Sequence, residues 1–110
     1  MPYAIRVRTG DDEGELYPLF ENREITVGRS PTNNIFIHDR NVSRVHCQIV
    51  VTGVGCTLTD LQSTNGTFVN EQRVTELKLK PGDELRVGTT LLQLEEVDDK
   101  GRAITDTAVM

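Results

Sequence analysis

Residues 45–60 have the sequence VHCQIVVTGVGCTLTD, which carries the clearest structural signal in the chain. Apolar and polar residues alternate on both sides of Thr52-Gly53-Val54-Gly55, which has the composition of a tight turn. Alternation at a period of two is typical of a strand with one buried face. The stretch therefore predicts two strands, over 45–51 and 56–60, joined as a hairpin.

The same alternation recurs in six other short segments. They are residues 4–7, 24–27, 35–37, 67–69, 84–87 and 91–97. Glycine, proline, aspartate and asparagine are concentrated between them, and no window combines a helical period with helix caps. Many short strands at regular spacing predict an all-β sandwich or barrel.

The 110 residues contain no internal repeat, which favours a single domain. The alternation ends at residue 97, so we expect a domain over 1–97 and a flexible tail or linker over 98–110. Hydrophobic residues make up 36% of the chain and charged residues 26%, which excludes a disordered or membrane-embedded protein. The first residues lack the apolar stretch of a signal peptide, so we expect a cytoplasmic protein. A monomer is the default expectation.

The two cysteines, Cys47 and Cys56, favour reduced thiols in the core of a cytoplasmic protein. A disulfide between them is the alternative. A metal site is disfavoured because no second cysteine pair or spaced histidine pair completes a tetrahedral set. We therefore expect neither a metal nor another cofactor.

The net charge of −5 argues against binding to nucleic acid or to an acidic membrane. The charge is uneven, because residues 29–46 carry +2 and the rest of the chain −7. A small basic region on an acidic protein suits a small anionic target. Within this region we expect Asp39 to be solvated or to pair with a neighbouring arginine.

Three loops carry more specific chemistry than connections require: residues 28–30, 41–46 and 63–67. They offer guanidinium groups, hydroxyls, an amide side chain and backbone N–H groups in segments that glycine makes conformationally free. These are the donors that hold a phosphate group, and arginine meets phosphate with a planar fork of N–H groups. In an antiparallel sandwich, loops that are distant in sequence can share one end of the molecule.

These loops follow an ordered pattern of short motifs. They are Gly28-Arg29, Ser43-Arg44-x-His46, Asp60-Leu61, Ser63-x-Asn65-Gly66-Thr67, Phe68-Val69-Asn70, Leu79-x-Pro81-Gly82-Asp83 and Val87-Gly88. In this order and at this spacing, residues 3–97 resemble the forkhead-associated (FHA) domain family. The resemblance implies a two-sheet antiparallel β-sandwich of about eleven short strands, with binding loops at one end. It also implies a phosphothreonine-peptide-binding module of Ser/Thr kinase signalling that is not an enzyme.

The resemblance assigns the phosphate contacts to four residues. Arg29 matches the arginine that clamps the phosphate, and Ser43 matches a hydroxyl donor. Arg44 matches a flanking basic contact, and Thr64 lies where the family often places another donor. Asn65 matches the amide that bonds the peptide backbone.

The remaining matches concern specificity and support. Asn41 lies where family members often contact the third residue after the phosphothreonine. Gly28, His46 and Gly66 match architectural positions, and His46 is expected to support the binding loop through hydrogen bonds. The sequence departs from the family at Glu71, where glycine is common, and this change is expected to alter a turn away from the phosphate loops.

Three other functions are alternatives to phosphopeptide binding. A hydrolase triad of Ser43, His46 and Asp60 is disfavoured because no nucleophile elbow or oxyanion motif accompanies it. A scaffold that binds an unmodified partner through a sheet face is the main alternative. A phosphorylated Thr105 or Thr107 that occupies the protein's own pocket is a third.

Overall fold

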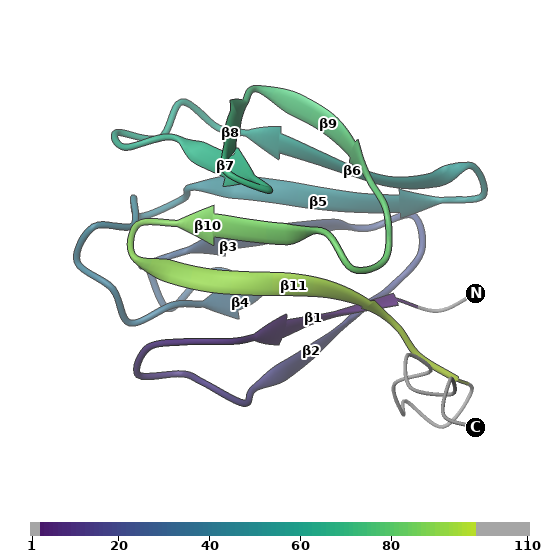
Figure 1. Cartoon of the computed structure of the whole chain (residues 1–110), viewed down its shortest axis with the longest axis horizontal. Helices are drawn as coiled ribbons and strands as arrows, with labels where there is room; N and C mark the ends of the chain where they lie inside the picture. Colours follow the sequence, from purple (N-terminus) through teal and green to yellow (C-terminus); the bar gives the residue numbers. More distant parts are fainter. Residues whose placement is uncertain (1–2, 99–110) are drawn as a thin grey trace.

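The computed structural model describes residues 3–98, which form eleven strands in two packed sheets (Figure 1). The strands are β1 (Tyr3–Val7), β2 (Leu16–Leu19), β3 (Glu24–Gly28), β4 (Ile35–Phe36), β5 (Cys47–Thr52), β6 (Gly55–Asp60), β7 (Thr67–Val69), β8 (Gln72–Val74), β9 (Glu76–Leu79), β10 (Glu84–Val87) and β11 (Thr90–Glu96). The predicted all-β sandwich of about eleven strands is confirmed.

One sheet has six strands in the order β2-β1-β11-β10-β7-β8, and the other has five in the order β4-β3-β5-β6-β9. The neighbours pair antiparallel with one exception, because β4 runs parallel to β3. The exception follows from the 28–34 loop, which carries the chain back along β3 before β4 begins. The parallel pairing places the end of β3 beside the start of the β4–β5 loop.

The predicted hairpin forms from β5 and β6. Ile49 opposes Leu58, and both are fully buried. Cys47 opposes Asp60 at the other end of the ladder. The predicted first strand of this hairpin was too long, because Val45 and His46 belong to the preceding loop.

The core lies between the inner faces of the two sheets. Its largest fully buried apolar side chains are Ile5, Ile35, Ile37, Ile49, Leu58, Leu85, Leu92 and Leu94. Each such burial stabilises the fold by about 1.5–3 kcal/mol. Cys47 and Cys56 are free thiols in this core, and burial raises their pKa values to about 12 and about 11.

Sequence alternation did not predict β2, β8 and β9. β2 and β8 are the edges of the six-stranded sheet, and β9 is an edge of the five-stranded sheet. Most of their side chains are exposed or half-buried, so their sequences lack an apolar face. Pro18 fits β2 because an edge strand tolerates a residue without an N–H group.

The β7–β8 turn contains the departure at Glu71. Val69 pairs with Gln72, which leaves Asn70 and Glu71 as a two-residue turn. Both have positive φ, 49° and 74°, and the second position of such a turn favours glycine. Asn70 bonds to the carbonyl of Glu84, at the end of β10 away from the phosphate loops.

None of residues 3–98 belongs to a helix that could cross a membrane. The predicted tail lies outside the described residues except for Asp98, and so do Thr105 and Thr107. The boundary between domain and tail therefore stays a prediction.

Candidate functional site

The three chemically rich loops meet at one end of the sandwich, on the left of Figure 1. The backbone N–H of Arg29 donates to the carbonyl of Ser43 over 3.0 Å, and that of Ser30 donates to Arg44 over 3.1 Å. The backbone N–H of Thr64 donates to Ser43 Oγ over 3.0 Å. The serine thus joins loops that are separated by twenty-one positions in sequence.

Arg29 is exposed, but its side chain is fixed at the base. Its Nε donates to the carbonyl of Val42 over 3.0 Å, and the side chain of Val42 is buried in the core. Within residues 3–98 the guanidinium forms no other hydrogen bond or ion pair. Its remaining N–H groups can therefore meet an anion in a preset orientation.

Ser43, Thr64 and Asn65 surround the same region. Ser43 Oγ accepts from Thr64, which leaves its O–H able to donate. Asn65 Nδ2 donates to the carbonyl of Asn41 over 2.9 Å, so the amide of one loop holds the backbone of another. Arg44, Thr64 and Asn65 are exposed.

His46 is fully buried and links two of the loops through both ring nitrogens. The backbone N–H of Ser43 donates to Nδ1 over 3.0 Å, and Nε2 lies 2.9 Å from the carbonyl of Gly66. Both contacts are satisfied when the neutral ring carries its proton on Nε2. Because both nitrogens are engaged with backbone, the ring is not placed to activate the Ser43 hydroxyl as a hydrolase triad requires.

Gly28 permits a close approach between two loops. A Cβ at this position would lie 2.1 Å from the carbonyl oxygen of Arg44 and 2.7 Å from Asn33 Nδ2. Gly66 has φ +90°, and a Cβ there would lie 2.7 Å from Nε of Arg73. Backbone packing therefore requires glycine at Gly28, while Gly66 combines a left-handed backbone with a guanidinium against its Cα.

Asn33 was missed in the sequence, although it is a buried polar residue of the site. Its Nδ2 donates to the carbonyls of Ser30 and Arg44 over 2.8 and 2.6 Å. The only sequence signal was its place in the polar 30–34 loop. Its amide holds that loop against the β4–β5 loop, and so fixes the backbone next to Arg29.

Asp60 organises the β6–β7 loop, a role that its sequence motif did not reveal. It accepts hydrogen bonds from Ser63 Oγ, Thr67 Oγ1 and Ser63 N over 2.6, 2.7 and 3.2 Å. Burial alone would raise the pKa of Asp60, but these bonds and the nearby His46 leave the pKa below its ordinary value. Ser63 Oγ also accepts from the N–H of Gly66, which fixes the loop beside Asn65.

Asp39 joins a fourth loop to the site. We expected it to be solvated or paired with an arginine, but it accepts from the hydroxyls of Thr89 and Thr90 and from the N–H of Thr89, each over 2.8 Å. It also accepts from the N–H of Asn41 over 2.9 Å. Burial opposes the charge, and these bonds outweigh it, so the pKa of Asp39 is lowered.

Known proteins are similar to this chain in sequence and in fold. A family model described as the cytoplasmic domain of the inner membrane component of the type III secretion system, an FHA-like family, matches residues 6–98. A solved domain described by its phosphothreonine-dependent FHA interactions superposes with a TM-score of 0.82 and 32% identity, over 89% of this chain and 99% of that one. The chain belongs to the FHA domain family.

Two further relatives are similar to this FHA domain. The FhaA FHA domain, solved in complex with the intracellular domain of Rv3910, has a TM-score of 0.77 and 34% identity over 84% of this chain and 98% of that one. The glycogen accumulation regulator GarA of Mycolicibacterium smegmatis is 34% identical over 82 residues. Those residues are 74% of this chain and 51% of GarA, so the FHA domain spans about half of that relative.

Proposed function

We propose that this FHA domain binds phosphothreonine-containing proteins in Ser/Thr kinase signalling and that it acts as a binding module and not as an enzyme. The observation that carries the proposal is the bonded junction of Arg29, Ser43 and Thr64. Three loops place a guanidinium, a free hydroxyl donor and a backbone turn at one end of the sandwich. A relative described by phosphothreonine-dependent interactions and another solved with a phosphopeptide support the same function.

In this proposal the phosphate supplies most of the affinity. Arg29 donates to it from the fork that Val42 orients, Ser43 donates its hydroxyl, and Thr64 and Arg44 contribute from either side. Each charge-assisted hydrogen bond contributes about 1.5–3 kcal/mol net. After the cost of ordering a peptide, a dissociation constant on the order of micromolar follows.

Residues outside the phosphate contacts determine how the peptide is held. Asn65 bonds the peptide backbone by exchanging its contact with the Asn41 carbonyl, and the side chain of Asn41 faces the third residue after the phosphothreonine. Gly28, His46 and Gly66 hold the loops in register. Preference for phosphothreonine over phosphoserine rests on one methyl group, which is worth about 1–3 kcal/mol in a fitted pocket, or roughly tenfold or somewhat more.

The setting of the interaction is part of the proposal. The free, buried thiols of Cys47 and Cys56 are compatible with the reducing cytoplasm, where Ser/Thr kinases would mark the partner. We expect the domain to act as a monomer, because binding needs only the exposed loop end. Neither nucleic acid nor a membrane is needed in this function.

The experiment that tests the proposal is capture of degenerate peptide libraries that carry phosphothreonine, phosphoserine or threonine at a fixed position. Wild type should retain the phosphothreonine library selectively. Arg29→Ala should lose detectable binding because the phosphate charge is left uncompensated, whereas Arg23→Ala removes an exposed arginine from the far end of β3 and should bind as wild type does. Equal capture by Arg29→Ala would show that the site is misassigned, and equal capture of unmodified peptides would favour the scaffold alternative.

Binding should also depend on pH through the ligand. The second pKa of a phosphomonoester is about 6, so the dianion dominates at pH 7 and the monoanion at pH 5. Titration of a fixed phosphothreonine peptide should therefore give weaker binding at pH 5 than at pH 7. An affinity that is constant over this range would contradict recognition of the dianion.

A further inference from the structure

The outer face of the six-stranded sheet carries a row of arginines that the phosphate site does not use. Strand pairing places Arg73 opposite Phe68, Phe68 opposite Arg86, and Arg86 opposite Leu91. The N–H of Arg8, the residue that follows β1, bonds to the carbonyl of Leu91 and so continues the row beyond β11. Directly opposed residues share one face of a sheet, so these five side chains form one strip across four strands and the residue after β1. We call it the arginine row.

The arginine row begins at the phosphate loops. Gly66 packs directly against the guanidinium of Arg73, and Asn65 is the residue before Gly66 in that loop. Phe68 is only two residues beyond Gly66 along β7. The row therefore starts within one side-chain length of the proposed peptide-binding position.

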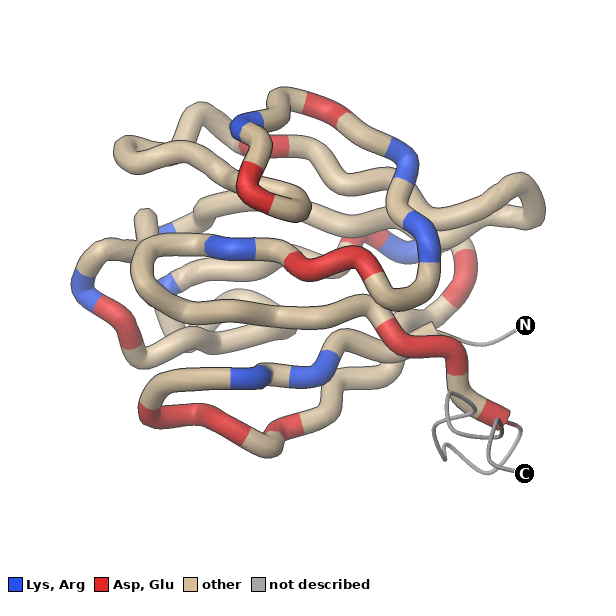
Figure 2. The backbone as a smooth tube through the Cα atoms, in the orientation of Figure 1, with Lys and Arg blue, Asp and Glu red and all other residues tan. Residues whose placement is uncertain are grey.

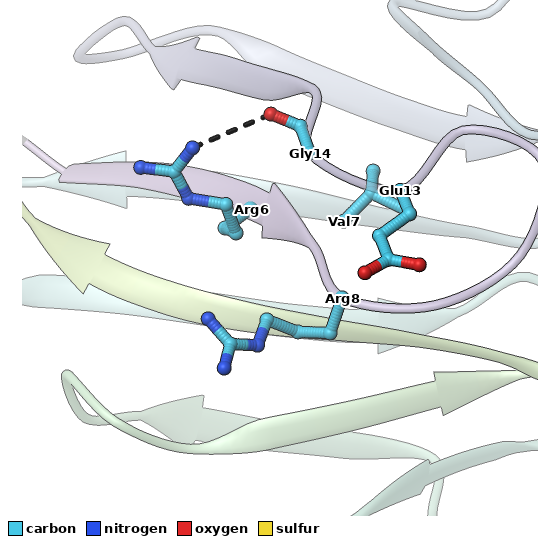
Figure 3. Close-up of a pocket in the computed structure, with 5 residues that line it drawn as sticks. All are labelled: Arg6, Val7, Arg8, Glu13 and Gly14. Carbon is cyan, nitrogen blue, oxygen red and sulfur yellow. Dashed lines mark hydrogen bonds between the residues drawn. The ribbon is translucent and has the colours of Figure 1, made fainter.

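The three arginines of the row form no ion pair within the part of the chain that the structure describes. Among residues 3–98, no carboxylate lies within 4.0 Å of Arg8, Arg73 or Arg86. Arg6 differs, because Glu95 pairs with it over 3.2 Å and its Nη1 donates to the carbonyl of Gly14 (Figure 3). Glu13 also lines the pocket that Figure 3 shows, but it forms no ion pair with Arg8.

Basic and acidic positions are unevenly placed along these strands. Figure 2 shows basic positions on β10 and β1, an acidic run in the loop that follows β1, and acidic positions on β10 and β11 farther from the loop end. Glu84 and Glu95 lie in that last zone, two or more residues from the arginine row. The chain as a whole is acidic, with a net charge of −5, so a basic strip beside the phosphate loops is a local exception.

The central arginine of the row is already oriented. The guanidinium carbon of Arg86 lies 4.2 Å from the ring centroid of Phe68, a cation–π contact that leaves the N–H edges free. Phe68, Arg86 and Leu91 are half-buried, while Arg8 and Arg73 are exposed. Oriented guanidinium groups separated by apolar side chains suit an extended segment that presents carboxylates at intervals.

We propose that the arginine row binds an acidic segment of the same phosphoprotein that places its phosphothreonine in the loops. This inference rests on the proposed function. Adjacent strands lie about 4.8 Å apart, so the row is about 19 Å long, which an extended segment of about six residues spans. In this arrangement the loops recognise the phosphothreonine, and the arginine row discriminates among phosphoproteins by their acidic segment.

The test compares three synthetic peptides with the same phosphothreonine core. One is the core alone, one carries a six-residue extension rich in glutamate, and one carries the same extension with glutamine in place of glutamate. The extensions are placed before or after the core in separate peptides, and affinities are measured by fluorescence anisotropy. Exposed charge pairs are weak, so we expect the acidic extension on one side to tighten binding about three- to tenfold over its neutral counterpart.

Protein variants then assign the gain to the row. Arg8→Gln with Arg86→Gln should abolish the gain and leave affinity for the core within about twofold. Arg8→Lys with Arg86→Lys, which keeps the charge, should retain most of it. Lys78→Gln with Lys80→Gln removes two charges in and just after β9, which belongs to the other sheet, and should leave the gain intact.

The outcomes separate the two proposals. If the core binds and the acidic and neutral extensions bind equally on both sides, the arginine row has no such role, while phosphothreonine binding stands. A gain that survives Arg8→Gln with Arg86→Gln in a folded protein also overturns the inference. If the core peptide itself does not bind, the proposed function fails and this inference fails with it.

Discussion

At the loop end of the sandwich, segments distant in sequence are joined by side chains that bond to backbone, whereas the tip of the β5–β6 hairpin at the opposite end bonds only locally. Asn65 holds the carbonyl of Asn41, and His46 holds that of Gly66. At the hairpin tip, Thr52 Oγ1 accepts from the N–H of Val54, whose side chain is 80% exposed. The difference indicates that polar contacts between loops fix the loop conformations at one end. At the other end, the hairpin tip is only a local turn.

The comparison is tested most severely by adding one carbon at each end. In Gly28→Ala the new Cβ would meet the carbonyl oxygen of Arg44 at 2.1 Å, while nothing lies within 4 Å of a Cβ at Gly53. We expect Gly28→Ala to lower the free energy of unfolding by about 4 kcal/mol and to abolish phosphopeptide binding. Gly53→Ala should change stability by less than about 0.5 kcal/mol. Urea denaturation of both variants measures the contrast, and equal stabilities would refute it.

A polar deletion at each end gives the next largest effect. His46→Ala leaves the N–H of Ser43 and the carbonyl of Gly66 without their partner inside the protein. Leaving a buried backbone group unsatisfied costs about 1–3 kcal/mol, so we expect a loss of about 3 kcal/mol and weaker binding. Thr52→Ala removes one exposed local bond and should cost at most about 0.5 kcal/mol. Thermal melts and anisotropy titrations check both, and a His46→Ala protein that is as stable as Thr52→Ala would contradict the loop-locking role.

Asp60→Asn sharpens the comparison through pH. The lowered pKa of Asp60 means that the carboxylate stabilises the fold above its unfolded pKa of about 3.9, and that this contribution disappears as pH falls through the lower folded value. We expect Asp60→Asn to be less stable than wild type by about 1 kcal/mol at pH 7, with the gap closing below about pH 4. Asp11→Asn, which removes an exposed carboxylate, is the control. Urea denaturation at pH 7, 5 and 3 would oppose the idea if the gap were the same at each pH.

The smallest expected change is a gain in stability at the end of β7 away from the site. Glu71 has φ +74°, where a side chain costs about 1–2 kcal/mol and glycine avoids that cost. We expect Glu71→Gly to raise the free energy of unfolding by about 1 kcal/mol and to leave peptide affinity unchanged. Glu71→Ala keeps the Cβ and should bring no comparable gain, so equal stabilisation by both would assign the effect to charge and not to backbone.

Much of the fold could be predicted because most of its inner strands bury one face. Ile49 and Leu58 alternate with polar neighbours, and the hairpin between them carries glycine, so both the strands and their pairing were visible in the sequence. The edge strands β2, β8 and β9 were not visible because exposed strands need no apolar period. The parallel pairing of β4 with β3 was equally hidden, since it depends on the path of a polar loop.

Sequence motifs predicted which loops meet at the candidate site, but they did not reveal the residues that support those loops. Arg29, Ser43 and Asn65 lie in ordered motifs, and the structure brings their loops together. Asn33 and Asp39 were missed or misjudged because their partners, Arg44 and Thr89, are eleven and fifty positions away. Asparagine and aspartate in a polar loop look solvated when only the sequence is known.

The hydrogen bond from Asn65 to the Asn41 carbonyl has a kinetic consequence. The protein itself holds these two loops together, so in the proposed binding mode an arriving peptide would exchange one bond for another and would not have to fold a loop. Docking on a preformed surface proceeds at about 10⁵–10⁷ M⁻¹s⁻¹ and varies little among related ligands. Partners that compete for this domain would then differ mainly in how long they stay bound, so the lifetime of the complex would set which signal persists.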